Sequence, residues 1–286
     1  MHDNAEIINH QNNMKKITII LLAAAIVALP SCKNRKNANE QEAKDYTEAT
    51  AEEINEEELK ANMAALIESA KKIKPVPFVK ATQDGTLVLS EKEKMVKPDY
   101  LLNPAKANSL ATLYQKYRAV GMFTADKNIA NMYGMSTTDY DESIFKLLTD
   151  INDPALKDFY TLPSIDIESD REAFEIFVDE EYEAGRANFF WDGTAAGLVE
   201  QLFILTRDVD KFMPMFTDEL ASDITFNFIC VHDGLTKMVE AYPEMESLNE
   251  VLTPLYVINA ITVEQLRTQL LEVKADIENA RAFLLQ

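Results

Sequence analysis

The stretch ANFFWDGTAAGLVEQLFILT, residues 187–206, decides the fold class of this chain. After Trp191-Asp192-Gly193, its apolar residues recur with the spacing of a helix, and no other predicted helix beyond the N-terminal segment is as apolar. Only 7 of the 286 residues are glycine. That is about a third of average usage, and such scarcity disfavours turn-rich β architectures. The stretch and its composition therefore predict an all-α fold.

Helical spacing continues on both sides of this stretch. Ser169 with Glu172 has the pattern of a capping box, and Thr217 and Thr262 are residues of the kind that open helices. Gly121 is expected to separate two helices. The pattern predicts eight or nine helices with short connections, packed as one bundle-like domain over residues 55–286.

One passage has β character. Phe78-Val79 and Leu87-Val88-Leu89 flank the dipeptide Asp84-Gly85. Asp-Gly is the favoured two-residue turn of a β-hairpin. The sequence therefore predicts either one short β-hairpin near Gly85 or an extended loop at the same place.

The segment MKKITIILLAAAIVALPSC, residues 14–32, has the three parts of a secretory signal. Two lysines are followed by an apolar run over 17–29 and by a small residue directly before Cys32. The run is shorter than the roughly 20 residues that a membrane span needs. Residues 1–13 are polar and acidic and fit no part of a signal, so we expect translation to begin at Met14.

The ending Leu29-Pro30-Ser31-Cys32 resembles the lipobox of bacterial lipoproteins. The resemblance implies that residues 14–31 are removed and that the Cys32 thiol carries a diacylglycerol, with further acylation of the new amino terminus. Two or more acyl chains hold a protein stably at a bilayer. Cleavage that leaves Cys32 free, or an uncleaved anchor, is the alternative. We expect a lipid anchor on Cys32, with the membrane as its partner.

The composition narrows the classes of partner and cofactor. The formal net charge is −20, so the chain is repelled by phosphate backbones and nucleic acid is not an expected partner. Beyond the signal, His232 is the one histidine, and Cys230 is the one cysteine besides Cys32. The sequence therefore lacks the ligands of a zinc site, and we expect neither a metal nor another cofactor.

Two passages resemble blocks of helical lipoproteins from Bacteroidetes-type bacteria. Residues 97–134 resemble a block that begins YLLNP and ends in an ADL-like motif, and residues 187–206 resemble a block centred on GGWIEGLY. Asp126 and Glu200 align with acidic residues of that family, whereas Trp191 precedes the position of the family's tryptophan. The resemblance implies an all-helical envelope lipoprotein and carries no reaction with it.

The resemblance also bears on location. Residues 32–54 are polar and charged, which is typical of a disordered tether behind the anchor. In lipoproteins of such bacteria, an acidic signal just after the cysteine tends to accompany surface display. Here Lys33-Asn34-Arg35-Lys36 is basic. We therefore expect the chain at the periplasmic face of the outer membrane.

The residues around the 187–206 stretch supply the candidate site. Two glycines four residues apart share a helix face, which favours close helix packing over a ligand cleft. Four charges in otherwise apolar helical stretches either form buried ion pairs or line a polar cavity. A tryptophan beside convergent polar groups is common in binding sites. The candidate ligand or polar cluster comprises Arg118, Asp126, Arg186, Trp191, Asp192, Gly193, Gly197 and Glu200.

Three classes of function compete at this stage. A non-enzymatic interaction module that engages another envelope protein is favoured, because the sequence has a long tether and lacks a nucleophile–base set. The alternative is a small-ligand binding protein with a cavity beside the segment from Trp191 to Glu200. A carboxylate-based hydrolase is permitted by the acidic composition, but no motif supports it. We therefore predict that the protein is not an enzyme.

Overall fold

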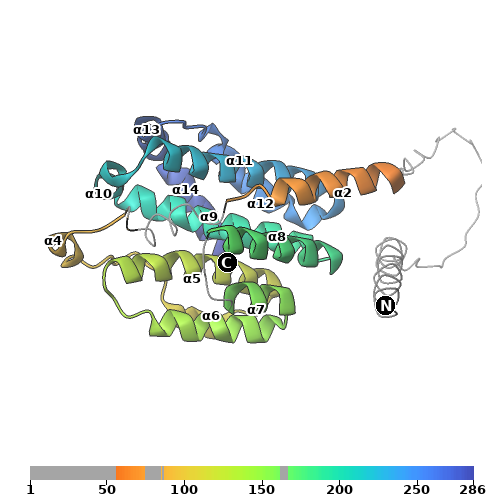
Figure 1. The fold of residues 1–286 in the computed structure, drawn as a ribbon, viewed down its shortest axis with the longest axis horizontal. Coiled ribbons are helices and arrows are strands. Elements are labelled where there is room, and N and C mark those ends of the chain that lie inside the picture. Colours follow the sequence, from red (N-terminus) through yellow and green to blue (C-terminus); the bar gives the residue numbers. More distant parts are fainter. Residues whose placement is uncertain (1–55, 75–84, 86, 162–166) are drawn as a thin grey trace, which may run out of the picture.

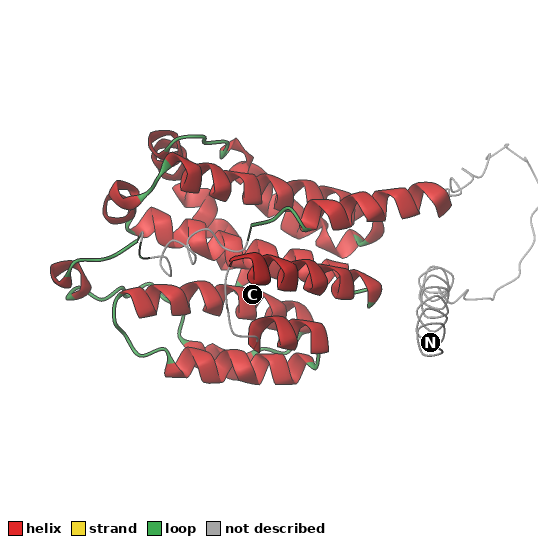
Figure 2. Cartoon of the chain, viewed as in Figure 1, coloured by secondary structure: helices red, strands yellow, loops and turns green. Residues whose placement is uncertain are grey.

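The computed structural model describes residues 56–74, 85, 87–161 and 167–286 (Figure 1). The regular elements in these ranges are helices, and no strand occurs among them, which confirms the all-α prediction (Figure 2). The predicted signal, the anchor at Cys32 and the tether lie outside the described residues. The helices of four residues or more are α2 (Glu56–Ala70), α4 (Glu91–Lys94), η1 (Pro104–Ser109), α5 (Leu113–Met132), α6 (Thr138–Ile151), α7 (Pro154–Thr161), α8 (Ile167–Glu183), α9 (Ala187–Arg207), α10 (Val209–Phe212), α11 (Asp218–Ala241), α12 (Glu246–Leu252), η4 (Thr253–Val257), α13 (Val263–Glu272) and α14 (Lys274–Leu284), with single 3-10 turns at η2 (Met213–Met215) and η3 (Pro243–Met245).

Helix α9 lies at the centre, between α5 on one side and α11 and α14 on the other (Figure 1). Its side chains are buried along most of its length, and Val199 and Leu202 are completely enclosed. A helix that is apolar on all sides is stable only where neighbours cover all sides, which explains why the most apolar stretch occupies the centre. Buried apolar side chains from Leu66 to Leu284 join into one core around it.

Polar side chains fix several helix starts in the way the sequence predicts. Thr217 and Thr262 each accept a backbone N–H from the first turn of α11 and α13, at 3.2 and 3.3 Å. Asn103 does the same for η1, at 2.9 Å. These bonds satisfy N–H groups that have no partner inside the helix, so they stabilise each helix at its first turn.

Several predicted helix boundaries were wrong. Gly121, expected to separate two helices, lies inside α5. The break before α9 falls at Gly185, whose φ of +70° is the left-handed conformation that glycine adopts readily, rather than at Trp191-Asp192-Gly193. Ser169, expected to cap a helix, lies inside α8. Gly185 separates α8 from α9 because the chain needs a positive φ there. Gly121 and Gly193 instead lie inside helices and allow α5 and α9 to pack closely.

The described part also contains more helices than the eight or nine predicted. The stretch from residue 103 to 120 is divided into η1 and α5, and the stretch that Thr262 opens is divided at Val273 into α13 and α14. The prediction near Gly85 lies mostly outside the described residues. Gly85 itself is in a turn with φ +71°, and residues 87–89 form no strand.

Candidate ligand-binding cavity

Helices α5 and α9 cross with their backbones in direct contact at three glycines. A Cβ atom added to Gly121 would lie 2.6 Å from the carbonyl oxygen of Gly193, and one added to Gly197 would lie 3.4 Å from the Cα of Gly121. Any side chain at Gly121 would therefore push the helices apart. The close approach expected from Gly193 and Gly197 is present, and Gly121 is the partner that the sequence interpretation missed.

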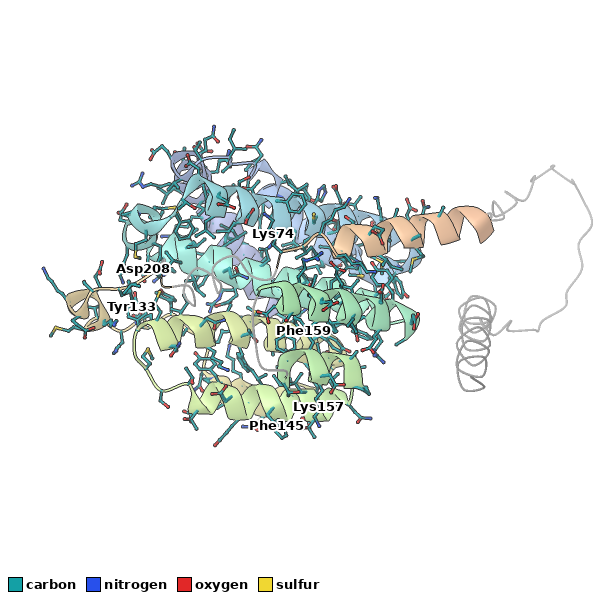
Figure 3. All side chains as sticks on the ribbon, viewed as in Figure 1. Lys74, Tyr133, Phe145, Lys157, Phe159 and Asp208 are labelled. Atoms are coloured by element: carbon teal, nitrogen blue, oxygen red, sulfur yellow. The ribbon has the colours of Figure 1, made fainter. Side chains whose placement is uncertain are left out.

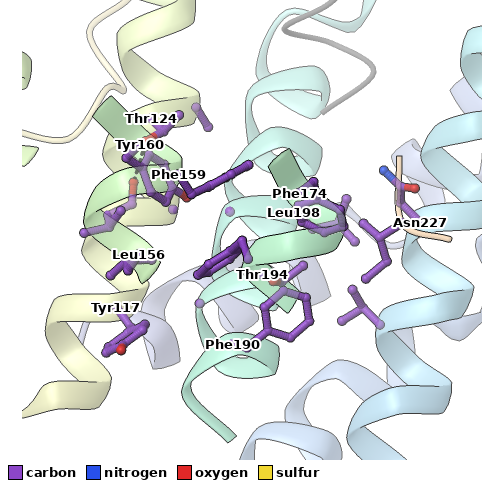
Figure 4. A pocket seen from close by; sticks show the side chains of 18 of the residues that line it. Tyr117, Thr124, Leu156, Phe159, Tyr160, Phe174, Phe190, Thr194, Leu198 and Asn227 are labelled. Carbon is purple, nitrogen blue, oxygen red and sulfur yellow. Dashed lines mark hydrogen bonds between the residues drawn. The ribbon is translucent and has the colours of Figure 1, made fainter. Parts of the chain in front are cut away.

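A cavity of about 140 Å³ lies beside this crossing (Figure 4). Helices α5, α7, α8 and α9 supply most of its wall, and α11 with the two residues Ile73 and Lys74 completes it. The wall is mainly apolar. Its aromatic side chains include Phe159, Tyr160, Phe174, Phe177, Phe189 and Phe190.

The rings of the wall pack against one another in stacked and tilted pairs. The ring centroids of Phe159 and Phe177 are 4.9 Å apart and nearly parallel, and those of Tyr117 and Phe189 are 5.1 Å apart. Such separations are those of favourable aromatic pairs. The wall is therefore held in shape by contacts among its own rings.

Most polar groups of the wall are already bonded within the protein. The Asn227 side chain donates to the backbone oxygen of Lys74 and accepts from its N–H, both at 2.8 Å. The Lys74 ammonium pairs with Asp223. Thr124 donates to the backbone oxygen of Val120 at 2.7 Å.

Burial raises the pKa of Tyr160 to about 12, and a hydrogen bond with the Thr124 side chain opposes the shift. Two other polar side chains of the wall, Gln201 and Thr194, differ. The Gln201 amide donates to the Gly197 carbonyl at 3.3 Å, but its own oxygen is buried without a donor. Thr194 is half-buried, and none of the hydrogen bonds in the described part involves its hydroxyl.

Trp191, the tryptophan of the candidate cluster, does not line this cavity. It is 0% exposed, and its indole N–H donates to the Tyr182 hydroxyl at 2.6 Å. Its ring lies against Gly234 of α11, where an added Cβ would be 2.4 Å from the ring. Trp191 therefore packs α9 against α11, and this contact explains why position 234 carries a glycine.

Arg118 and Asp192, both in the candidate cluster, bind each other. The Arg118 guanidinium donates two hydrogen bonds to the carboxylate, at 2.8 and 2.9 Å. Burial raises the pKa of Asp192, and the arginine opposes the shift. The guanidinium also lies near the ring of Phe283, 5.4 Å from its centroid. The pair joins α5 to α9 and leaves neither charge free for a ligand.

Asp126 and Glu200 lie together in the core, each completely buried. Arg281 of α14 donates to both oxygens of Glu200 at 2.7 Å. Asp126 accepts the backbone N–H of Leu102 at 2.8 Å, and its other oxygen has no hydrogen-bond partner. Burial, followed by the charge of Glu200, raises the pKa of Asp126 well above its ordinary value. Burial also raises the pKa of Glu200, and the bound Arg281 guanidinium opposes that shift.

Arg186 belongs to a separate cluster behind the cavity wall. It donates to Asp153 at 2.7 Å and to Glu181 at 3.2 Å. Tyr117, whose ring lines the cavity, donates to the same Asp153 carboxylate. Burial raises the pKa of Glu181 to about 8, and the neighbouring Asp153 adds to the shift.

The predicted site residues are thus divided among five places. Gly193 and Gly197 border the cavity, Trp191 packs on α11, and the charges form the three ion-pair clusters just described. Sequence reasoning missed Arg281 and Asp153 because their partners are far away in the chain. Glu181, which lies only five residues before its partner Arg186, was missed as well. It also missed the aromatic wall from α7 and α8, where Phe159, Phe174 and Phe177 keep the ordinary spacing of a helix core face and so carried no separate signal.

Two further findings concern the described residues only. No group of three His, Cys, Asp or Glu side chains among them is placed to hold a metal ion. None of the helices in this part is long and apolar enough to cross a membrane.

The fold and the cavity define an all-α protein with an aromatic-walled cavity beside a glycine crossing. Comparison of the chain with family models, curated proteins and solved structures gives no match. The resemblance to helical lipoproteins of Bacteroidetes-type bacteria, drawn from residues 97–134 and 187–206, therefore stays a prediction.

Proposed function

We propose that the helical region is a binding protein for a small, mainly apolar ligand that occupies the cavity between α5, α7, α8 and α9. The observation that carries this proposal is the aromatic-walled cavity of about 140 Å³ beside the glycine crossing. An apolar cavity of about 150 Å³ in another protein stays dry and binds benzene or xenon. Ligand sites are typically concave and lined by apolar and aromatic side chains.

The ligand contacts in this proposal differ from those of the sequence alternative, in which Arg118, Asp126 or Arg186 would contact a ligand. Arg118 and Arg186 are bound in ion pairs, the other arrangement that the sequence allowed, and Asp126 is enclosed in the core. The ligand contacts are instead the rings of α7, α8 and α9. This arrangement favours apolar contact over charge recognition.

Ala125→Phe tests the proposal. Ala125 is buried and lines the cavity, so a phenyl group at this position would fill the space that a ligand needs. We expect benzene to bind the wild-type protein, with a shift of methyl and aromatic NMR signals from the wall, and to bind the variant at least about tenfold more weakly.

The matched control is Ala241→Phe, which makes the same change at an exposed position at the end of α11. Its benzene affinity should equal that of the wild type. Far-UV circular dichroism and the melting temperature establish that both variants are folded. Absence of benzene binding in the wild type, or unchanged binding in folded Ala125→Phe, would overturn the proposal.

We also propose that the chain is an envelope lipoprotein anchored by lipid on Cys32 at the periplasmic face of the outer membrane. The signal over residues 14–31 and the lipobox-like ending support this proposal, and the basic residues after Cys32 support the periplasmic face. The protein would then bind its ligand in the cell envelope.

A non-enzymatic interaction module is a second candidate function, because one segment presents apolar side chains to solvent. Val88, Met95 and Val96 are 60%, 81% and 71% exposed. The segment includes α4, which lies at the opposite end of the molecule from the start of α2 (Figure 1). Exposed apolar side chains gathered in one place are typical of protein contacts.

Crosslinking in intact cells tests this second candidate. The wild-type chain should crosslink to another envelope protein, and Met95→Asp with Val96→Asp should abolish the product. Val257→Asp, at an exposed apolar position on η4, is the matched control and should keep it. Recovery of this chain alone from repeated experiments counts against an interaction module.

A further inference from the structure

The wall of the cavity contains two threonines, of which Thr124 bonds within its own helix and Thr194 does not. Threonines in the other described helices commonly donate to a backbone oxygen three or four residues back. Thr194 of α9 makes no such bond, and no hydrogen bond in the described part involves its hydroxyl. Those that do donate in this way are Thr124, Thr149, Thr161, Thr206 and Thr253.

Thr194 is placed where a bound molecule would meet it. It is four residues from Phe190 and four from Leu198, so the three side chains lie on one face of α9. All three line the cavity (Figure 4). Because Thr194 is half-buried, water or a ligand can reach it. Its hydroxyl can donate one hydrogen bond and accept two.

The charges near the cavity are already neutralised. Lys74 is the charged residue of the wall, and its ammonium pairs with Asp223 of α11. The other ion pairs, including Arg186 with Asp153, lie outside the wall. A charged ligand would lose its hydration without gaining an opposite charge, which is costly. An uncharged ligand has no such penalty.

The wall also favours a ring over a flexible chain. The rings of Phe159, Phe177 and Phe190 surround a space of about 140 Å³, which is close to the volume that accepts a single benzene ring in an apolar cavity. Another aromatic ring can stack on these or meet them edge to face. A flexible chain of equal volume would lose more conformational freedom on binding.

We infer that the cavity selects an uncharged molecule with one aromatic ring and one hydroxyl group or a similar polar group, which Thr194 binds by a hydrogen bond. This inference rests on the proposed function and names the chemical class of its ligand. Thr194 acts as the residue that determines specificity, and the rings supply the affinity.

Calorimetric titration with phenol, benzene, cyclohexanol and benzoate tests the inference. We expect phenol to bind the wild-type protein about three- to tenfold more tightly than benzene, because one net hydrogen bond is gained. Cyclohexanol, which lacks the aromatic ring, should bind more weakly than phenol. Benzoate should bind at least about tenfold more weakly, because its charge has no partner in the cavity.

Thr194→Val removes the hydroxyl with almost no change of volume, so it should bring phenol affinity down to that of benzene and leave benzene affinity unchanged. Thr194→Ser keeps a hydroxyl and should retain the preference for phenol. Thr206→Val on the same helix is the matched control, because Thr206 is buried, bonds to the Phe203 oxygen and lies outside the cavity wall.

The outcomes separate this inference from the proposed function. If benzene and phenol both fail to bind, the cavity is not a ligand site and both proposals fall. If benzene binds but phenol gains nothing, or if folded Thr194→Val keeps the preference for phenol, the inference alone is overturned and the proposed function stands.

Discussion

Glu181 is a buried acid whose proton is linked to the stability of the fold. Its side chain is completely enclosed beside Arg186 and Asp153, and burial raises its pKa from an ordinary 4.5 to about 8. In the unfolded chain the same carboxyl releases its proton at about its ordinary pKa. Between these two pKa values, the folded state binds a proton that the unfolded state does not, so the free energy of unfolding falls as the pH rises.

We expect Glu181→Gln to flatten this pH dependence. The contribution of Glu181 to stability should be fully present below its unfolded pKa, and the wild-type protein should lose on the order of 2 kcal/mol or more of it between about pH 5 and pH 8. The glutamine variant cannot lose a proton at this position, so its loss over the same range should be smaller. It should not vanish, because Asp126 also has a raised pKa. Urea unfolding at a series of pH values measures both slopes.

Glu180→Gln is the control for this experiment. Glu180 is the neighbouring residue on α8 and is exposed, so the substitution makes the same change of charge on the surface. Its pH dependence should match that of the wild type. Equal slopes for Glu181→Gln and Glu180→Gln would contradict a raised pKa at Glu181.

Helices α9 and α14 are joined by an arginine that neutralises a buried acid. Arg281 donates both hydrogen bonds to Glu200 and stacks on Phe203, with its guanidinium carbon 3.8 Å from the ring centroid. It also donates to the backbone oxygen of Tyr100 at 3.1 Å. One side chain thus connects the last helix, the central helix and the segment ahead of η1.

We expect Arg281→Met to destabilise the protein by about 3–5 kcal/mol, because removal of one partner leaves a buried charge unpaired. The double variant Arg281→Met with Glu200→Gln should recover part of this loss. Arg267→Met removes a surface arginine that pairs with Asp210 and should have little effect. Urea unfolding of the four proteins measures the differences. A loss in Arg281→Met no larger than that in Arg267→Met would contradict the assigned role.

The sequence predicted the helical elements better than their contacts. Apolar spacing and capping residues such as Thr217 are local, and they predicted the fold class and several helix starts correctly. The interruption expected at Gly121 was wrong because a glycine inside a helix and a glycine that ends one look alike in sequence. What separates them is a packing partner, here Gly193, which lies far away in the chain.

The candidate cluster was drawn from local patterns, which do not contain its contacts. Gly193 and Gly197 approach α5 closely and border the cavity, and Arg118 binds another member of the cluster, Asp192. The cavity itself depends on how α7 and α8 meet α9. Its wall contains phenylalanines at ordinary core positions, so no local pattern distinguishes them from residues that fill the core.

The chain has a formal net charge of −20, and the acidic side chains of the described part lie mainly at its surface. The buried acids of this part are Asp126, Asp153, Glu181, Asp192 and Glu200, and Arg118, Arg186 and Arg281 pair with four of them. Figure 3 labels one contact of this surface, the Lys157 ammonium beside the exposed ring of Phe145. A surface of this charge is repelled by anionic lipid headgroups, so a tethered domain would stand away from the bilayer.

We expect lipid attachment to depend on Cys32. Cells grown with radiolabelled palmitate should incorporate label into the wild-type chain, which should sediment with membranes. Cys32→Ala should lose both properties, because the thiol is the acceptor in a lipobox. Cys230→Ala is the control, since Cys230 is buried in the core, and it should keep the label. Equal labelling of wild type and Cys32→Ala would overturn the anchor.

The pairing of Glu200 with Arg281 has a consequence for how the chain matures. The two residues are 81 positions apart, so a ribosome completes α9 well before its neutralising arginine. At about 5–20 residues per second, the delay is roughly 4 to 16 seconds. During that interval, burial of this helix would leave the Glu200 carboxyl without its arginine. We therefore expect α9 to reach its buried position only after α14 has been made.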